Sequence, residues 1–170
     1  MPIIINQYSD ALVRRFKLER EHLLKVLPSS VQIEHVGSTA VGLGGKNIID
    51  ILIGVSSRAL MNQVRDILVK NGYFEGNDTH LDRIFLASKT SETGEGDFHV
   101  HICPIDEDSF KDFIILRDYF IKNPNIAKEY ESKKYEFAKM AGYDRKRYKA
   151  LKSEYVSNIL LNAKKKIDLD

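Results

Sequence analysis

The chain has 170 residues, of which 43% are hydrophobic and 29% are charged, and its 26 Lys and Arg against 24 Asp and Glu give a net charge of +2. A domain of this length buries roughly 68–70% of the surface of its unfolded chain, so a hydrophobic core is expected and disorder is excluded. The balanced charge excludes a surface that is basic all round, as in a general nucleic-acid binder. We expect one domain over residues 1–170, with a sheet-bearing part at 1–104 and a helical part at 105–170.

The charge is divided unevenly along the chain. Residues 1–110 carry 11 basic and 15 acidic groups, whereas residues 111–170 carry 15 basic and 9 acidic groups. An acidic part suits metal ions and a basic part suits phosphates, so this division predicts a cleft between two unlike parts.

Cys103 is the single cysteine of the chain, which excludes an intramolecular disulfide and a multi-cysteine zinc site. No segment reaches the ~18 apolar residues of a membrane helix, and Met1 to Gln7 lack the pattern of a signal peptide. We expect a cytoplasmic protein without a membrane partner, and the oligomeric state stays open.

The first hundred residues mix helical and extended patterns. Apolar residues at helical spacing after Ser9 predict a helix at about 10–26 that ends before Pro28. The run from Ile48 to Val55 is almost continuously apolar, which is typical of a strand buried on both faces. Further patterns predict strands at 31–36, 83–87 and 98–103, a helix at 59–70 and a hairpin loop at 92–96.

After Pro104 only helical periodicity is found. Asp108 or Ser109 can cap a helix that runs through Ile121. Asn123 and Pro124 begin a second helix to about residue 140, and Asp144 caps a third to about residue 166.

A glycine-rich segment follows the strand at 31–36. Gly37 to Gly45 hold four glycines among nine residues, which predicts a loop whose backbone can approach a ligand closely. Gly37, Ser38 and Thr39 offer backbone N–H groups and hydroxyls, the donors that phosphate oxygens need.

Asp50 lies within the buried strand, twelve residues after Ser38. A carboxylate in an apolar strand costs several kcal/mol of desolvation unless a cation meets it, and Mg²⁺ bridging to phosphates is one such cation. The alternative is an Asp capped by nearby N–H groups or paired with Lys46 or Arg83.

Cations for phosphates are found in both parts. Lys46 and Arg83 flank the cluster of candidate site residues and are natural counter-charges for phosphates, and either can equally be an ordinary surface cation. The last helix carries a basic run near Tyr148 and Lys152. If this helix folds over the sheet, Tyr148 can stack on a base and Lys152 can reach a phosphate. A solvated helix face also explains the run, and contact with RNA or DNA is a weaker alternative.

His99 and His101 alternate along one predicted strand, so both side chains point to the same face. On the face of Asp50 they can complete a metal site with Asp50, or with Glu34 and His35. Imidazole ligands favour Zn²⁺ or Mn²⁺ over Mg²⁺. The alternative is that the two rings hydrogen-bond to neighbours in a polar seam of the sheet.

Residues 33–51, with Glu34-His35-Val36-Gly37-Ser38-Thr39 and Ile48-Ile49-Asp50-Ile51, resemble the GrpB-like family of the nucleotidyltransferase superfamily. The resemblance continues through Gly72-Tyr73, Phe98-His99-Val100-His101, Leu116-Arg117-Asp118-Tyr119-Phe120 and Lys152-Ser153-Glu154-Tyr155-Val156, and so covers nearly the whole chain. It implies an α+β fold: a mixed sheet with flanking helices and a helical C-terminal portion, with the Gly-Ser turn facing the phosphates of a nucleotide.

The resemblance also bears on activity. In the wider superfamily, two carboxylates one residue apart and a third from a later strand bind two metal ions for attack on the α-phosphate. Here Ile51 and Leu52 follow Asp50, so the second carboxylate is missing, and His99 and His101 stand where the third is expected.

We interpret the sequence as that of a nucleotidyltransferase-like protein that binds a nucleoside triphosphate and a divalent metal. It would transfer a nucleotidyl group to an unknown acceptor, with Asp50 as the catalytic residue. One alternative is a non-catalytic module that binds a nucleotide or a phosphorylated metabolite. Another is a mononuclear metal hydrolase that uses His35, Asp50, His99 and His101.

Overall fold

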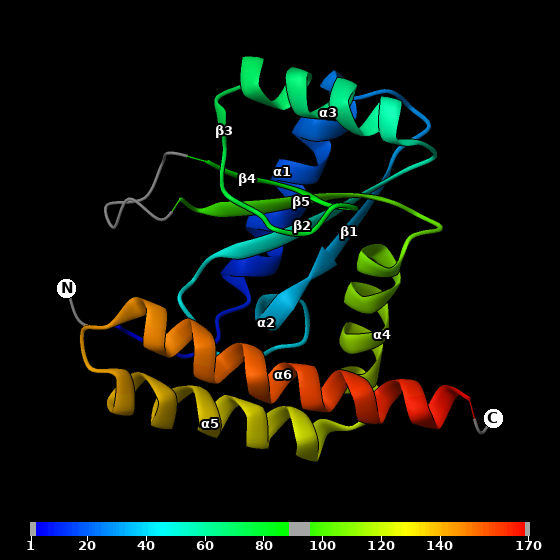
Figure 1. The fold of residues 1–170 in the computed structure, drawn as a ribbon. Helices are drawn as coiled ribbons and strands as arrows, with labels where there is room; N and C mark the ends of the chain where they lie inside the picture. The colour runs from blue at the N-terminus through cyan, green and yellow to red at the C-terminus, as the bar shows by residue number, and fades with distance from the viewer. Residues whose placement is uncertain (1–2, 89–95, 169–170) are drawn as a thin grey trace.

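The computed structural model describes residues 3–88 and 96–168, which form a five-stranded sheet with helices on both faces (Figure 1). In chain order the elements are α1 (Ala11–Val26), β1 (Gln32–Val36), α2 (Gly37–Ala40), β2 (Ile49–Val55), α3 (Arg58–Lys70), β3 (Tyr73–Glu75), β4 (Ile84–Ser88), β5 (Phe98–Pro104), α4 (Asp108–Lys122), α5 (Pro124–Ala141) and α6 (Arg145–Ile167).

The sheet has the strand order β1-β2-β5-β4-β3. β2 and β5 run parallel, whereas the other three pairs of neighbours are antiparallel, so the sheet is mixed. β2 lies between two strands, and Ile51, Leu52 and Ile53 along it are fully buried. The continuous apolar run therefore forms a strand covered on both faces, as its sequence predicts.

α1 and α3 cover one face of the sheet (Figure 1). α3 begins after Ser57, whose hydroxyl accepts a hydrogen bond from the backbone N–H of Leu60 at 3.1 Å and so caps the helix. Met61, Val64 and Leu68 recur at helical spacing and are buried against the strands. Burial of this apolar stripe, rather than helix propensity, fixes α3 on the sheet.

The other face is covered by the helical part of the chain. α4 packs Phe110 against Leu52 and Cys103, and α5 and α6 run antiparallel beside each other below the sheet (Figure 1). A separate apolar cluster joins these helices to the glycine-rich loop and contains Leu43, Phe120, Ala127, Tyr130 and Ile159. Burial raises the pKa of the Cys103 thiol to about 12, so Cys103 is a packed and unreactive residue.

The predicted α+β fold with a mixed sheet is confirmed, and the predicted elements match to within about two residues. Two differences are found. β3 is not predicted, because three residues are too short to show a strand pattern, and the predicted loop after β1 begins with the short helix α2. Of the predicted hairpin loop at 92–96, all but Gly96 lies outside the described residues.

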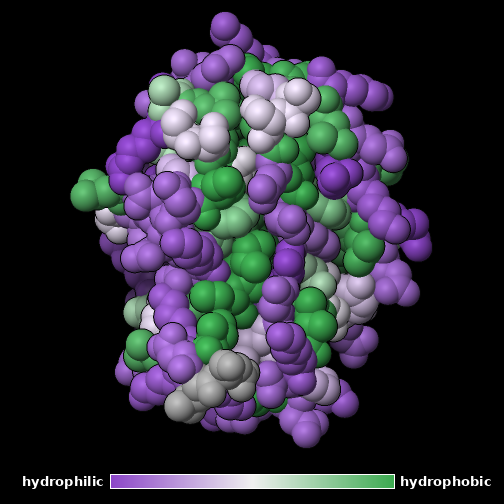
Figure 2. Space-filling model, turned by 90° about the vertical axis from the view of Figure 1, so that its right-hand side faces the viewer, coloured by the Kyte–Doolittle hydropathy of each residue, from purple (hydrophilic) through white to green (hydrophobic). Residues whose placement is uncertain are grey.

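Within the described part of the chain, no helix combines the length and the apolar character that crossing a membrane requires. Figure 2 shows the side of the molecule that carries α4 and the end of α6, where apolar side chains lie between hydrophilic ones. Residues 112–119 of α4 are all half-buried, and Ile105 and Ile121 are exposed.

Leu68 and Val69 are neighbours on α3 with exposed fractions of 0% and 47%. Leu68→Ala leaves a cavity in the core and should lower the free energy of unfolding by about 2–5 kcal/mol. Val69→Ala should change it by less than about 0.5 kcal/mol. Urea unfolding followed by circular dichroism measures both values, and equal losses would contradict this packing of α3.

Candidate functional site

Asp50, His99 and His101 form a polar patch on the face of the sheet that the helical part covers. Side chains alternate along a strand, and the register places Asp50 beside His99 on β5 and opposite Val36 on β1. Asp50 Oδ1 lies 3.4 Å from His101 Nε2 and 3.9 Å from His99 Nδ1. The structure therefore brings the predicted aspartate and both predicted histidines together.

Asp50 is ionised in this setting. Burial alone raises the pKa of Asp50, but the hydrogen bond and charge of His101, with the charges of His99 and Lys152, outweigh burial and lower it. The Nδ1 atom of His101 is buried and has no hydrogen-bond partner in the described structure.

The turn after β1 lies directly against Asp50. Gly37 has a φ of +75°, in the left-handed region, and a Cβ at this position would lie 2.4 Å from Asp50 Oδ2. No L side chain fits here without displacing the carboxylate. Glycine therefore allows the Gly37-Ser38 turn, in which Gly37 is exposed and Ser38 half-buried, and the aspartate to share one site.

Lys134 of α5 reaches this turn from the helical part of the chain. Its side chain is 2% exposed, and its Nζ donates hydrogen bonds to Ser38 Oγ at 2.8 Å and to the carbonyl of Gly44. The ammonium group also lies 4.9 Å from the ring centroid of Tyr130.

Lys134 carries an unusual pKa. Burial, together with the charge of Lys152, lowers the pKa of Lys134 to about 8, and the charges of Glu131 and Asp50 oppose this shift. The charges of Glu131 and Asp50 therefore only partly offset burial, and Lys134 loses its proton at a lower pH than a lysine in water does.

Two segments fix the glycine-rich loop beside Lys134. Glu131 of α5 accepts a hydrogen bond from the backbone N–H of Gly44. Asn6 and Gly45 form a short antiparallel bridge, with N–H···O distances of 2.7 and 3.0 Å. The loop is therefore held by the N-terminal segment and by the helical part together.

Lys46, Tyr148 and Lys152 are three further residues that the sequence predicts to bind a nucleotide. Lys46 Nζ lies 5.3 Å from the centroid of the Tyr148 ring, and Tyr148 is 4% exposed. Since Lys46 covers that ring, Tyr148 does not offer this face to a base in the present arrangement. Lys152 is half-buried, and its charge acts on both Asp50 and Lys134.

His35 and Thr39 face away from Asp50. His35 stacks on Phe16 of α1 with ring centroids 4.2 Å apart, and its Nε2 lies 2.8 Å from Thr39 Oγ1. Burial is the largest effect and lowers the pKa of His35 to about 4, although the charge of Asp50 raises it; the charge of Arg117 adds a smaller lowering. The predicted grouping of His35 with Asp50 is therefore not found, because strand alternation sends their side chains to opposite faces.

Glu34 and Arg83 are also engaged elsewhere. Glu34 Oε2 accepts a hydrogen bond from Arg117 Nη1 of α4 at 2.7 Å. Arg83 pairs with Asp78 in the loop before β4. Arg83 directly precedes Ile84, which pairs with Ile102 of β5. Arg83 therefore lies roughly 13 Å along the strand from His99, and the sheet does not bring it to Asp50.

The predicted metal site requires several His, Cys, Asp or Glu side chains that lie close together around Asp50. Among residues 3–88 and 96–168, no three His, Cys, Asp or Glu side chains form a group that could hold a metal ion. Leu52, two residues after Asp50 on the same face, is fully buried against Val36 and Cys103. The residues beside Asp50 therefore do not fit a resident metal centre.

Sequence reasoning missed Lys134 and Arg117. A weak signal for Lys134 exists, because it shares a helical face with Ala127, Tyr130 and Ala141, all of which are buried. A lysine on an apolar helix face requires partners from another element. Ser38, 96 residues earlier in the chain, could not be identified from α5 alone.

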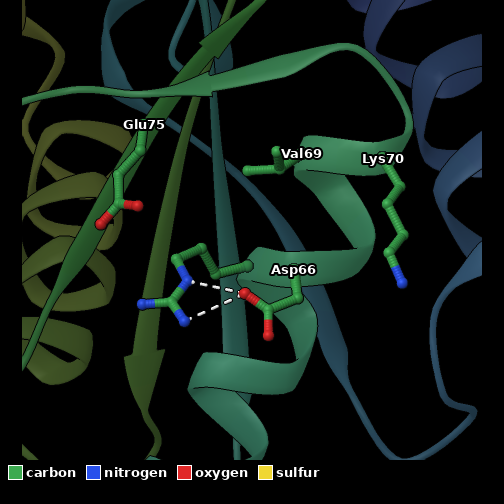
Figure 3. Close-up of a pocket in the computed structure, with 5 residues that line it drawn as sticks. Asp66, Val69, Lys70 and Glu75 are labelled. Atoms are coloured by element: carbon green, nitrogen blue, oxygen red, sulfur yellow. Dashed lines mark hydrogen bonds and ion pairs between the residues drawn. The ribbon is translucent and has the colours of Figure 1, made fainter.

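A separate hollow lies beside α3 and β3, on the other side of the sheet (Figure 3). Arg65, Asp66, Val69, Lys70 and Glu75 line it. Arg65 and Asp66 pair with each other at 3.0 Å, and none of the predicted site residues reaches this hollow.

Solved structures identify the class of fold. The crystal structure of the Cid1 poly(U) polymerase with MgGTP bound has a TM-score of 0.53 at 18% identity, over 79% of this chain and 44% of that chain. A cytoplasmic RNA terminal U-transferase has a TM-score of 0.51 at 19% identity, over 79% and 43%. The protein thus has a nucleotidyltransferase-like fold, and at this identity the likeness shows the fold alone.

The family described as GrpB protein matches residues 2–162, so the chain belongs to the GrpB family. The glutamate-rich protein GrpB of Alkalihalophilus pseudofirmus is 30% identical over 163 residues, 93% of this chain and 94% of the relative. YqkA of Bacillus subtilis is also 30% identical, but the chain spans 46% of its length. The crystal structure of GrpB from Enterococcus faecalis has a TM-score of 0.83 at 28% identity, over 96% and 99% of the two chains.

Gly37 and Gly42 provide a matched pair of substitutions. Both have φ near +75°, at +75° and +73°, but a Cβ at Gly42 meets nothing within 4 Å. Gly42→Ala should therefore cost only the left-handed backbone, about 1–2 kcal/mol. Gly37→Ala carries the same strain and also displaces Asp50, so its loss in thermal or urea unfolding should be clearly larger. Equal losses would show that Gly37 and Asp50 are not in contact.

Proposed function

We propose that the protein binds a nucleoside triphosphate, with the phosphates at the Gly37-Ser38 turn beside Lys134 and Lys152. The observation that carries this proposal is the buried ammonium of Lys134 on the hydroxyl of Ser38. Burial of a lysine has a desolvation cost, and at Lys134 the charges of Glu131 and Asp50 do not outweigh burial and the charge of Lys152. A phosphate at the turn would add negative charge near this ammonium group.

Access to the turn supports the same proposal. Gly37 is exposed, Ser38 is half-buried and the side chain of Asp50 is 29% exposed, so solvent reaches the site from the side of the turn. The fold of the Cid1 structure with MgGTP bound is similar, which favours a nucleotide over other phosphate compounds.

Nucleotidyl transfer to an acceptor, the predicted activity, stays a prediction. The superfamily chemistry needs carboxylates that hold metal ions, and Asp50 is the carboxylate that the described residues bring to the turn. The geometry therefore supports binding more directly than turnover. The alternative of a mononuclear metal hydrolase loses one of its four expected ligands, because His35 lies on the other face of the sheet.

Lys134→Met tests the proposal at its centre. Methionine has a similar length and no charge, so replacing a buried ammonium by it need not unfold the protein. We expect the affinity for ATP, measured by isothermal titration calorimetry, to fall at least about tenfold. Lys133→Met is the matched control, because Lys133 is the adjacent residue and pairs with Glu136 at the surface.

The control should bind ATP as the unchanged protein does. Absence of heat with ATP, GTP, CTP and UTP for the unchanged protein would refute nucleotide binding. Equal affinity of the two lysine variants would remove Lys134 from the site. Release of pyrophosphate from the same samples, lost in Asp50→Asn, would establish transfer in addition to binding.

Proton uptake provides a further test. A phosphate beside Lys134 should raise the pKa of this lysine from about 8 towards its ordinary value. ATP binding at pH 8–9 should therefore take up a fraction of a proton, and the affinity should fall as the pH rises through about 8. Calorimetry in buffers of different ionisation enthalpy measures this uptake, which should vanish at pH 6.5 and in Lys134→Met.

A further inference from the structure

We propose that lysine charge, and not a divalent metal ion, neutralises the phosphates at the Gly37-Ser38 turn, so that the nucleotide binds without metal. This inference rests on the proposed function. It concerns the state in which the nucleotide is recognised, namely as the free anion rather than as its magnesium complex.

The donor set beside Asp50 is the first support. Asp50 Oδ1 faces the Nε2 of His101 at 3.4 Å and the Nδ1 of His99 at 3.9 Å. Strand alternation places Leu52 next on this face, and Leu52 is fully buried among apolar residues. A second carboxylate that could share a cation with Asp50 is thus replaced by a packed hydrocarbon side chain.

Nearby acids from other elements do not complete the set. Glu34, the acid of β1 on this face, is paired with Arg117 at 2.7 Å. Glu131 of α5 is hydrogen-bonded to the backbone N–H of Gly44. Within the described ranges, no group of three potential ligands results, so the protein does not provide the three ligands of a catalytic zinc site.

Cations from the helical part occupy this region instead. Lys134 donates to Ser38 Oγ, and Lys152 lies close enough for its charge to act on both Lys134 and Asp50. A phosphate group bound at Ser38 would lie close to the ammonium of Lys134, whose Nζ is 2.8 Å from Ser38 Oγ. Complexing the nucleotide with Mg²⁺ removes two of its negative charges and so weakens this attraction.

Asp50 then has the opposite effect from a metal ligand. Without a bridging cation, its ionised carboxylate repels the phosphates at short range. Its removal should strengthen binding of the free nucleotide, whereas removal of a metal ligand should weaken binding. The sign of one substitution therefore separates the two mechanisms.

The experiment is calorimetric titration of the full chain with ATP, once in excess EDTA and once in millimolar MgCl₂, for the unchanged protein and for Asp50→Asn. We expect binding in EDTA at least as tight as in MgCl₂. Asp50→Asn should bind ATP in EDTA about threefold to tenfold more tightly. Lys25→Met, on the exposed side of α1, should behave as the unchanged protein in both buffers.

Each outcome decides the inference. Binding that requires Mg²⁺, or that is lost in Asp50→Asn while its thermal unfolding is unchanged, overturns it and leaves nucleotide binding intact. Binding of ATP in neither buffer overturns the proposed function itself. Should Asp50→Asn fail to fold, the comparison of the two buffers for the unchanged protein still gives the answer.

Discussion

The ammonium group of Lys134 connects the helical part of the chain to the sheet. It is the buried cation of α5, and its hydrogen bonds end on Ser38 at the turn after β1 and on Gly44 in the glycine-rich loop. A buried charge without partners is costly, so this contact restricts how α5 can lie against the loop. The position of α6, and with it Lys152, follows from the packing of α6 on α5.

Close contact between Gly37 and Asp50 is a second constraint, and it fixes the turn after β1 against β2. The left-handed glycine lets the turn bend back over the start of β2, where the carboxylate is held by His101. The polar patch therefore combines one ionised carboxylate, two imidazoles and two lysine side chains at one end of the sheet. Such a set is suited to recognising an anion, and the proposals above follow from this balance of charge.

Much of the fold could be predicted from the sequence, because its signals are local. The apolar run of β2, the helical spacing of α3 and the cap at Ser57 depend on neighbouring residues alone. β3 escaped prediction because its three residues become a strand only by pairing with β4. The candidate site was predicted in part: Asp50, His99 and His101 do meet, but His35 and Arg83 lie elsewhere.

By itself the sequence determined the α+β fold, the family and the residues of the turn, since these depend on periodicity and on motifs of consecutive residues. Only the tertiary structure decided that Lys134 meets Ser38 across 96 positions of the chain. It also decided that Glu34 is engaged by Arg117. The net charge of +2 concealed this arrangement, because the free energy of a charge depends on its burial and on its nearest partners, which only packing defines.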